Sequence, residues 1–277
     1  MAVVLALLAA VSYGVSDFIG GLASRRRSAL AILLYSYPVG ALLMAALLPV
    51  TSGTLTTRAV VFGILGGAFG LVGVVLLYSL LAIAPMNVVS PITAVLAAAV
   101  PVVVGVLTGD RPATAAWFGV AIGFVAVVLV SRQPAETPHG RLTTRTVALA
   151  IASGVGFGGY FVFLARAGDG TGLWPLLISR LASAVLIVPL AYRAGAVTVI
   201  RGWLLALCLI AGALDAGANL FFLLASRQGL LSLAAVITAL YPATTVALAI
   251  VFLHERPSRA QQVGLGLAAV AIVLITR

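Results

Sequence analysis

Apolar runs of membrane-spanning length follow one another along almost the entire chain, separated by short polar stretches. An α-helix needs about 20 consecutive apolar residues to cross the hydrocarbon core of a bilayer. Charges, prolines and glycines divide the chain into ten such runs. Their approximate bounds are 2–22, 29–50, 59–82, 86–108 and 113–131, then 146–166, 173–192, 202–225, 230–253 and 260–276. The pattern predicts an all-α integral membrane protein with ten transmembrane helices.

The composition agrees with a bundle whose outer surface faces lipid. Of the 277 residues, 63% are hydrophobic and 8% are charged, whereas soluble domains carry about 25% charged residues. The net charge of +10 comes mostly from arginines at predicted helix ends and in short loops, where charge sets topology and contacts lipid headgroups. Because no basic soluble face is predicted, we expect membrane lipid and no nucleic acid as a partner.

The two halves of the chain resemble each other, which indicates a duplication. The loop Asp110-Arg111-Pro112 matches Glu255-Arg256-Pro257. The same offset and a slightly different one pair further positions, namely Gly67 with Gly212, Thr93 with Thr238 and Gly14 with Gly158. We therefore predict a first five-helix repeat at 1–132, a short polar linker at 133–145 and a second five-helix repeat at 146–277.

An odd number of spans in each repeat gives the two halves opposite orientations in the membrane. Inverted repeats of this kind enclose a site near the middle of the bilayer and permit alternating access to it. No nucleotide-binding motif accompanies them, so transport would be driven by gradients or by substrate exchange. The predicted fold class is thus two inverted five-helix repeats.

Short motifs lie at corresponding places within the repeats. An aromatic-Gly pair, Tyr13-Gly14 or Phe157-Gly158, lies in the first helix of each half, and a polar segment, 173–180, leads into the seventh helix. With the acidic-Arg-Pro loops and the five-plus-five arrangement, these motifs make essentially the whole chain resemble the EamA-type ten-helix members of the drug/metabolite transporter (DMT) superfamily. In one departure from a regular repeat, the counterpart of Arg180 in the first half is about Ser36.

The resemblance implies a central cavity between the halves and transport of amino acids, other metabolites or organic cations, without naming one substrate. It also implies a multi-pass protein of the cell (inner or plasma) membrane with both termini on the cytoplasmic side. The arginines favour the opposite orientation, because most of them, including Arg25, Arg26 and Arg27, would then lie outside. We expect a monomer or a weak homodimer.

Three ionisable residues fall within predicted spans: Asp17, Arg180 and Asp215. A charge at the centre of a membrane helix costs at least about 2.5–3.5 kcal/mol, so such residues usually face a cavity or each other. Asp215 shares a helix face with Asn219, and Asp17 shares one with Tyr13. We expect Asp215, and in second place Asp17, to bind a proton or a cationic group of the substrate.

A structural role is the alternative for these carboxylates, with Arg180 forming an ion pair with Asp215 or Asp17. For Arg180 itself, binding of a substrate carboxylate stands beside a counter-ion or headgroup role. Either aspartate would also suit proton coupling, because a low dielectric disfavours the charged carboxylate.

Prolines interrupt the fourth and ninth predicted helices, at Pro91 and Pro101 and at Pro242. Interrupted helices at corresponding places in two repeats point to a transport site. Polar residues near them are candidates for lining it, with plain kinks and back-bonded hydroxyls as the alternative. These candidates are Asn87, Ser90 and Thr93 in the fourth helix and Thr238, Tyr241 and Thr245 in the ninth.

Four tyrosines complete the candidate site, either by cation–π contact with a substrate or by packing. They are Tyr13, Tyr78, Tyr160 and Tyr241. The chain lacks a complete zinc-peptidase or serine-nucleophile motif, so we predict no catalytic residue, metal or cofactor. An Asp17/Asp215 hydrolase and a channel are minor alternatives.

The function predicted is a secondary active transporter, an exporter or exchanger, of a small metabolite such as an amino acid or organic cation, working by alternating access and coupled to protons. The alternative is an uncoupled facilitator or a lipid flippase.

Overall fold

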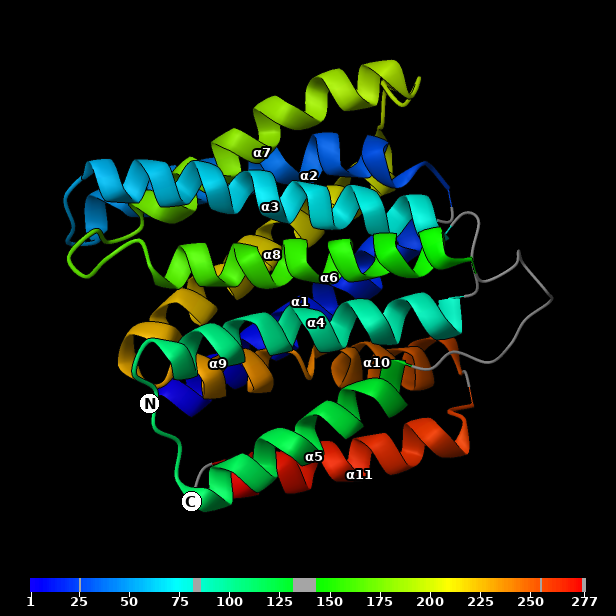
Figure 1. The fold of residues 1–277 in the computed structure, drawn as a ribbon. Helices are drawn as coiled ribbons and strands as arrows, with labels where there is room; N and C mark the ends of the chain where they lie inside the picture. Colours follow the sequence, from blue (N-terminus) through cyan, green and yellow to red (C-terminus); the bar gives the residue numbers. More distant parts are fainter. Residues whose placement is uncertain (25, 82–85, 132–142, 255, 276–277) are drawn as a thin grey trace.

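The computed structural model describes residues 1–24, 26–81, 86–131, 143–254 and 256–275. These residues form eleven α-helices and one 3₁₀ turn, and the helices form a bundle in which they lie roughly parallel or antiparallel to one another (Figure 1). Their bounds are α1 Ala2–Ser24, α2 Ala29–Leu47, η1 Leu48–Val50, α3 Thr57–Leu81, α4 Met86–Leu107, α5 Thr114–Ser131, α6 Thr144–Ala165, α7 Trp174–Arg193, α8 Gly202–Gln228, α9 Leu231–Thr238, α10 Tyr241–Leu253 and α11 Arg259–Ile275.

The predicted spans are confirmed to within a few residues. Eight helical segments of the described chain are long and apolar enough to cross a membrane, and two shorter apolar helices complete the set. Polar residues outside the apolar runs set several helix starts. The hydroxyl of Ser28 accepts a hydrogen bond from the Ala31 N–H at the start of α2, and Thr143 accepts one from Thr146 at the start of α6.

The ninth span, Leu231–Leu253, is interrupted as expected, because it is divided into α9 and α10. The Leu240 N–H bonds to the Ile237 carbonyl, which closes a tight turn instead of continuing the α-helix. The next helix starts at Tyr241 and Pro242, where a proline is favoured because the first turn needs no N–H donor. Pro242 therefore acts as the start of a second half-helix.

The matching expectation for the fourth helix is wrong. The helix α4 is continuous from Met86 to Leu107, although Pro91 and Pro101 lie within it. A proline removes a single N–H donor from the helical ladder, and the remaining bonds can carry the helix past it. Only the ninth span, among the described helices, is broken near its middle.

The two repeats are inverted and interleaved. The start of α1 and the end of α11 lie at one end of the bundle, which we call the terminal end, whereas α6, the counterpart of α1, starts at the opposite, distal end (Figure 1). Helices of one repeat pack mainly on helices of the other: α1 on α8, α6 on α3, α2 on α8, α7 on α3, and α5 on α11. The interface between the repeats therefore runs through the centre of the molecule.

Glycines permit the closest of these crossings, and they occur in symmetric pairs. A Cβ atom at Gly212 would lie against the backbone of Ser36 on α2, and one at Gly67 would lie against the backbone of Ser179 on α7. Small residues at such points let membrane helices approach backbone to backbone. Gly67 and Gly212, which correspond in sequence, thus make the same packing contact: Gly67 makes it with the second repeat and Gly212 with the first.

The glycines of the two aromatic-Gly pairs also lie at close helix crossings. A Cβ atom at Gly14 would lie 2.7 Å from the Tyr241 carbonyl oxygen, and one at Gly158 would lie 3.1 Å from that of Leu96. Both glycines thus belong to the first helix of one repeat where it crosses the fourth span of the other. The motif maintains a helix crossing in both repeats, whereas its aromatic residues differ: Tyr13 bonds to Asn219 at the centre of the bundle, and Phe157 packs beside Gly73 on α3.

Serine hydroxyls join the helices at these crossings, and these bonds involve no charged side chain. They donate hydrogen bonds to carbonyl oxygens of the neighbouring helix, which binds helices together in an apolar medium. The bonds are Ser16 to Ala211 at 2.9 Å, Ser36 to Cys208 at 3.0 Å, Ser153 to Gly73 at 2.7 Å and Ser183 to Gly67 at 3.0 Å.

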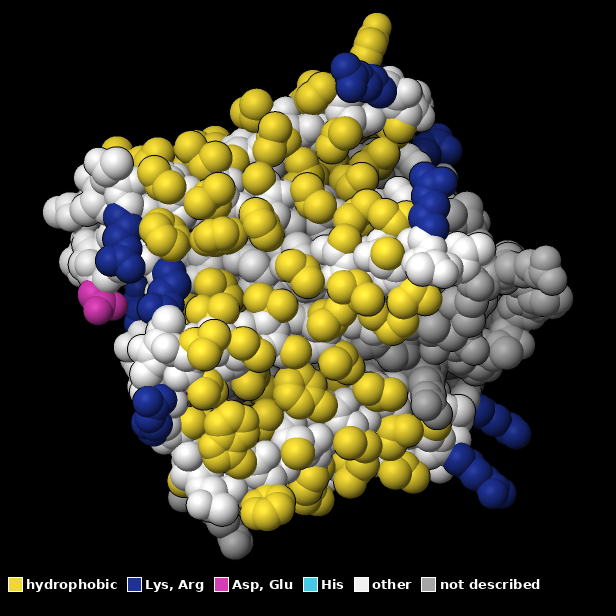
Figure 2. Space-filling model, in the orientation of Figure 1, with side chains coloured by type: hydrophobic (Ala, Val, Ile, Leu, Met, Phe, Trp, Pro, Cys, Tyr) yellow, Lys and Arg dark blue, Asp and Glu magenta, His cyan; other side chains and the backbone are white. Residues whose placement is uncertain are grey.

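The outer surface has the distribution of side chains that a bilayer requires. Hydrophobic side chains cover the middle of the face shown in Figure 2, and arginines lie at both ends of it. Large apolar residues such as Leu42, Val185 and Phe252 are 70%, 69% and 66% exposed. In water this surface would be unfavourable, whereas lipid chains cover it without cost.

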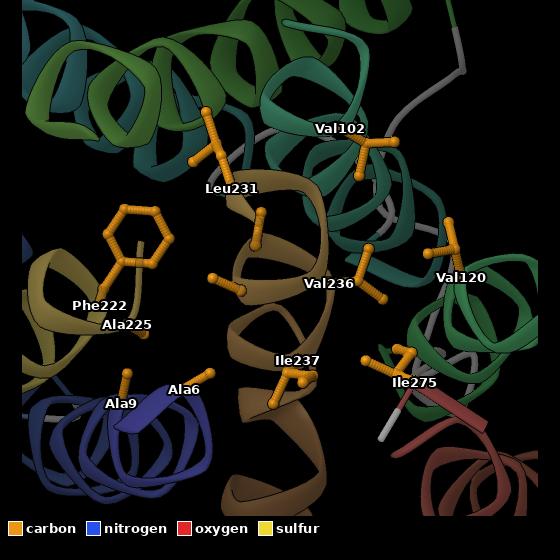
Figure 3. Close-up of a cluster of buried hydrophobic side chains, with 12 residues drawn as sticks. Ala6, Ala9, Val102, Val120, Phe222, Ala225, Leu231, Val236, Ile237 and Ile275 are labelled. Atoms are coloured by element: carbon orange, nitrogen blue, oxygen red, sulfur yellow. The ribbon is translucent and has the colours of Figure 1, made fainter. Parts of the chain in front are cut away.

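The terminal half of the bundle has a dry core around α9 (Figure 3). Buried side chains of α1, α4, α5, α8 and α11 surround Val236 and Ile237 of α9, which are each 1% exposed. In contrast, α10, which continues toward the distal end, has no buried residue. The two halves of the ninth span thus differ in burial, because α9 is enclosed by other helices and α10 is not.

Replacement of a crossing glycine tests this packing. We expect Gly212→Ala to lower the free energy of unfolding by about 1–3 kcal/mol, because the new methyl group must displace α2. Gly217→Ala is the matched control on the same helix: a Cβ there meets no atom within 4 Å, so stability should stay equal or rise by up to about 1 kcal/mol. Thermal unfolding of the detergent-solubilised protein measures both, and equal losses would contradict the packing.

Candidate substrate site

The charged residues of the membrane interior meet at the interface between the repeats. The Arg180 guanidinium, on α7, forms an ion pair with the Asp215 carboxylate, on α8. The two side chains are 8% and 32% exposed. This is the structural alternative that the sequence leaves open for Asp215, and each charge offsets part of the penalty of placing the other in a low dielectric.

Residues of α2 shape the place that Arg180 occupies. A Cβ atom at Gly40 would lie 3.2 Å from Cδ of Arg180, so the glycine makes room for the arginine side chain. The guanidinium carbon lies 5.7 Å from the ring centroid of Tyr37, within range of a cation–π contact. The Nε atom of Arg180 is buried and has no hydrogen-bond partner among the described residues.

A chain of hydrogen bonds connects this pair to the first repeat. The Asn219 side-chain amide donates to the backbone carbonyl of Asp215 at 2.6 Å. The Tyr13 hydroxyl, on α1, donates to Oδ1 of Asn219 at 2.5 Å. Since Asn219 is 2% exposed, its amide is fixed in one orientation, and α1 and α8 are joined at the depth of the ion pair.

Aromatic rings surround Tyr13 and border the polar cluster. Its ring centroid lies 6.1 Å from that of Tyr241, at the start of α10, and 6.1 Å from that of Phe161, on α6. Tyr160 adjoins Phe161 with a centroid distance of 5.6 Å and lies close enough to Arg180 and Asp215 to interact with their charges. The cluster therefore draws side chains from both repeats, as a central transport site requires.

Asp17 differs from the other two charged residues. Its side chain is exposed, and it lies near enough to Asp215 for the two like charges to interact. Toward the distal end of α1, a Cβ at Gly20 or Gly21 meets no atom within 4 Å, which agrees with open space there. In the described part of the chain no arginine pairs with Asp17.

The remaining predicted site residues have other surroundings. The Thr93 hydroxyl donates to the Ala150 carbonyl at 3.4 Å, which connects α4 to α6. Thr238 is fully buried at the end of α9, and its hydroxyl has no partner within the described chain. The Tyr78, Asn87 and Ser90 side chains lie outside the described residues.

Sequence reasoning missed Tyr37 and Gly40, the residues that hold Arg180 from the side of α2. Both lie on the face of α2 that packs on α7 and α8. Their spacing of three residues places them on one helix face, but nothing in the sequence says which helix that face meets. No three His, Cys, Asp or Glu side chains gather as metal ligands in the described ranges.

Interleaved inverted repeats, an apolar outer band and a polar cluster at the repeat interface define a multi-pass membrane transporter. The family model of the EamA-like transporter family matches residues 1–132 and 144–277. The chain therefore belongs to the EamA-like transporter family, and both the predicted resemblance and the fold class are confirmed. This is a family of transporters, so the enzyme alternative is excluded.

Similarity to known proteins adds the fold and nothing more specific. A crystal structure described only as that of a protein aligns with a TM-score of 0.79 at 19% sequence identity, over 99% of this chain and 96% of the solved chain. No curated protein matches the chain. The substrate must therefore be argued from the site.

The Arg180–Asp215 pair can be tested by a double-mutant cycle on stability. We expect Arg180→Gln to lower the free energy of unfolding by about 2 kcal/mol or more, because Asp215 then lacks its counter-ion. Adding Asp215→Asn should recover part of this loss, since no lone charge remains. Thermal unfolding in detergent measures the cycle, and strictly additive losses would contradict a direct pair.

Proposed function

We propose that the chain is a secondary active transporter, an exporter or exchanger, of a small metabolite with a positively charged group. An amino acid, through its ammonium group, and an organic cation both meet this description. In the proposed mechanism Asp17 binds the positive group, and helices of the two repeats move about the central cluster to expose it to one side at a time.

The observation that carries the proposal is the unpaired carboxylate at Asp17. Arg180 and Asp215 neutralise each other, whereas Asp17 borders accessible space without a cationic partner in the described residues. An exposed carboxylate inside a membrane bundle is open to a ligand of opposite charge, and a carboxylate within a span typically faces a cavity or a charged partner. The ring of Tyr13, one helical turn before Asp17, contacts the ring of Tyr241 and is suited to cation–π contact with the same group.

This proposal reverses the order that the sequence favours for the two aspartates. Asp215 is nearer the middle of its helix, but its carboxylate is already bound to Arg180. We propose that Asp215 instead orients the guanidinium of Arg180, which donates hydrogen bonds to a carboxylate of the substrate when the helices move. A zwitterion would then contact Asp17 with one end and Arg180 with the other.

The unequal packing of the two ends supports alternating access. The buried α9 and its apolar surroundings close the terminal half, while Asp17 and the unburied α10 border the distal half. A site that is closed on one side and accessible on the other is one of the two states that alternating access requires. The turn at Leu240, between α9 and α10, lies at the boundary between these two halves of the bundle.

Proton coupling belongs to the same proposal. A proton and a cationic substrate group compete for one carboxylate at Asp17, so binding of one favours release of the other. We propose that both termini lie on the cytoplasmic side of the cell membrane, as the family implies. The excess of arginines at the distal end favours the opposite orientation.

Flux into proteoliposomes tests the proposal with a panel of amino acids and cationic metabolites, with and without an imposed pH gradient. We expect saturable flux that responds to the gradient, and a fall of about ten- to a hundredfold in kcat/KM for Asp17→Asn, the usual worth of a contact to a charged group. Asp169→Asn is the control, because it removes the same charge from an exposed loop.

The outcomes separate the alternatives. Undiminished flux in Asp17→Asn would remove Asp17 from the site. Flux that ignores the pH gradient would indicate an uncoupled facilitator, and movement of labelled lipid in place of every soluble compound would indicate a flippase.

A further inference from the structure

A cavity lies at the distal end of the bundle and contains no residue of the polar cluster. It has a volume of about 480 Å³ and is lined by Arg27, Val199, Ile200, Arg201 and Leu204. These residues come from the α1–α2 connection, the α7–α8 connection and the start of α8. We infer that this cavity binds the phosphate headgroup of an anionic phospholipid. The inference does not depend on which substrate the protein transports.

The positive charge of the cavity favours an anionic ligand. Arg27 and Arg201 are both exposed, and none of the lining residues is acidic. Two guanidinium groups on one cavity suit a phosphodiester, whose oxygens accept several hydrogen bonds from them. Basic cavities between membrane helices bind acidic lipid headgroups for this reason.

The walls of the cavity are held in place before any ligand binds. The Ile200 N–H donates to the Tyr35 hydroxyl at 3.2 Å, and that hydroxyl donates to the Thr198 carbonyl at 3.1 Å. The Ile200 side chain is 3% exposed and packs in a buried cluster with Ile32 and Cys208. The α7–α8 connection is therefore fixed against α2, so little ordering entropy is lost when a headgroup enters.

The apolar surroundings favour a lipid over a soluble anion. Val197 and Val199 are 60% and 68% exposed beside the arginines, which would be unfavourable in water. Trp203, 59% exposed, lies under the guanidinium of Arg26 at 5.8 Å from its centroid. Tryptophan and arginine side by side are typical of the headgroup level of a membrane, so the aliphatic residues meet the glycerol and upper acyl region while the arginines meet the phosphate.

Native mass spectrometry of the delipidated full-length protein tests this site by titration with phosphatidylglycerol and with phosphatidylcholine of the same chain length. The wild type should prefer phosphatidylglycerol. The double variant Arg27→Gln/Arg201→Gln should bind it about twentyfold more weakly, since each arginine at the headgroup level contributes about a factor of five. The control Arg145→Gln/Arg259→Gln makes the same change of charge at exposed arginines of the distal end and should bind within about a factor of two of wild type.

Thermal unfolding and size-exclusion elution establish that both double variants are folded. Equal weakening in the two double variants would overturn the assignment, because attraction would then be general to the charged end. Binding of glycerol 3-phosphate as tight as that of phosphatidylglycerol would also overturn it, in favour of a soluble phosphate ester.

Discussion

An arginine in the middle of a membrane protein requires an anion beside it, and the pair of Arg180 with Asp215 determines how the rest of the central site is arranged. The pair joins α7 to α8, and Asn219, fixed one turn from Asp215, joins α8 to α1 through the Tyr13 hydroxyl. This network uses one aspartate, whereas the other, Asp17, is exposed and has no counter-ion among the described residues. We therefore assign a structural role to Asp215 and propose the binding role for Asp17.

The scaffold is symmetric, but the chemistry built on it is not. Gly67 and Gly212 make the same crossing in opposite directions, and the aromatic-Gly pairs do so too. The offset that relates these glycines takes Asp215 to Gly70 in the first repeat, so the first half has no equivalent ion pair. Duplication therefore explains how the helices pack, whereas the charged residues at the centre of the bundle differ between the halves.

The spans, the repeats and the family could be predicted from the sequence, because the thickness of a bilayer imposes a length and a composition on each helix. The break in the ninth span was also signalled, by Pro242, yet Pro91 in the fourth span carries a similar signal and α4 continues. What the sequence could not decide was which aspartate Arg180 pairs with. That choice depends on the rotation of α7 against α8 and on the space at Gly40, and these are properties of the packed bundle that no local pattern encodes.

Labelling with an apolar carbodiimide, which activates carboxyl groups within membranes, tests the division between the two aspartates most directly. Protein in lipid vesicles would be labelled, digested and analysed by peptide mass spectrometry, with and without a transported cation from the flux panel. The account predicts modification of Asp17, protection of Asp17 by the cation, and little modification of Asp215 while Arg180 is present. Ready modification of Asp215 with Asp17 untouched would contradict it, because the ion pair would then not be the resting arrangement of the site.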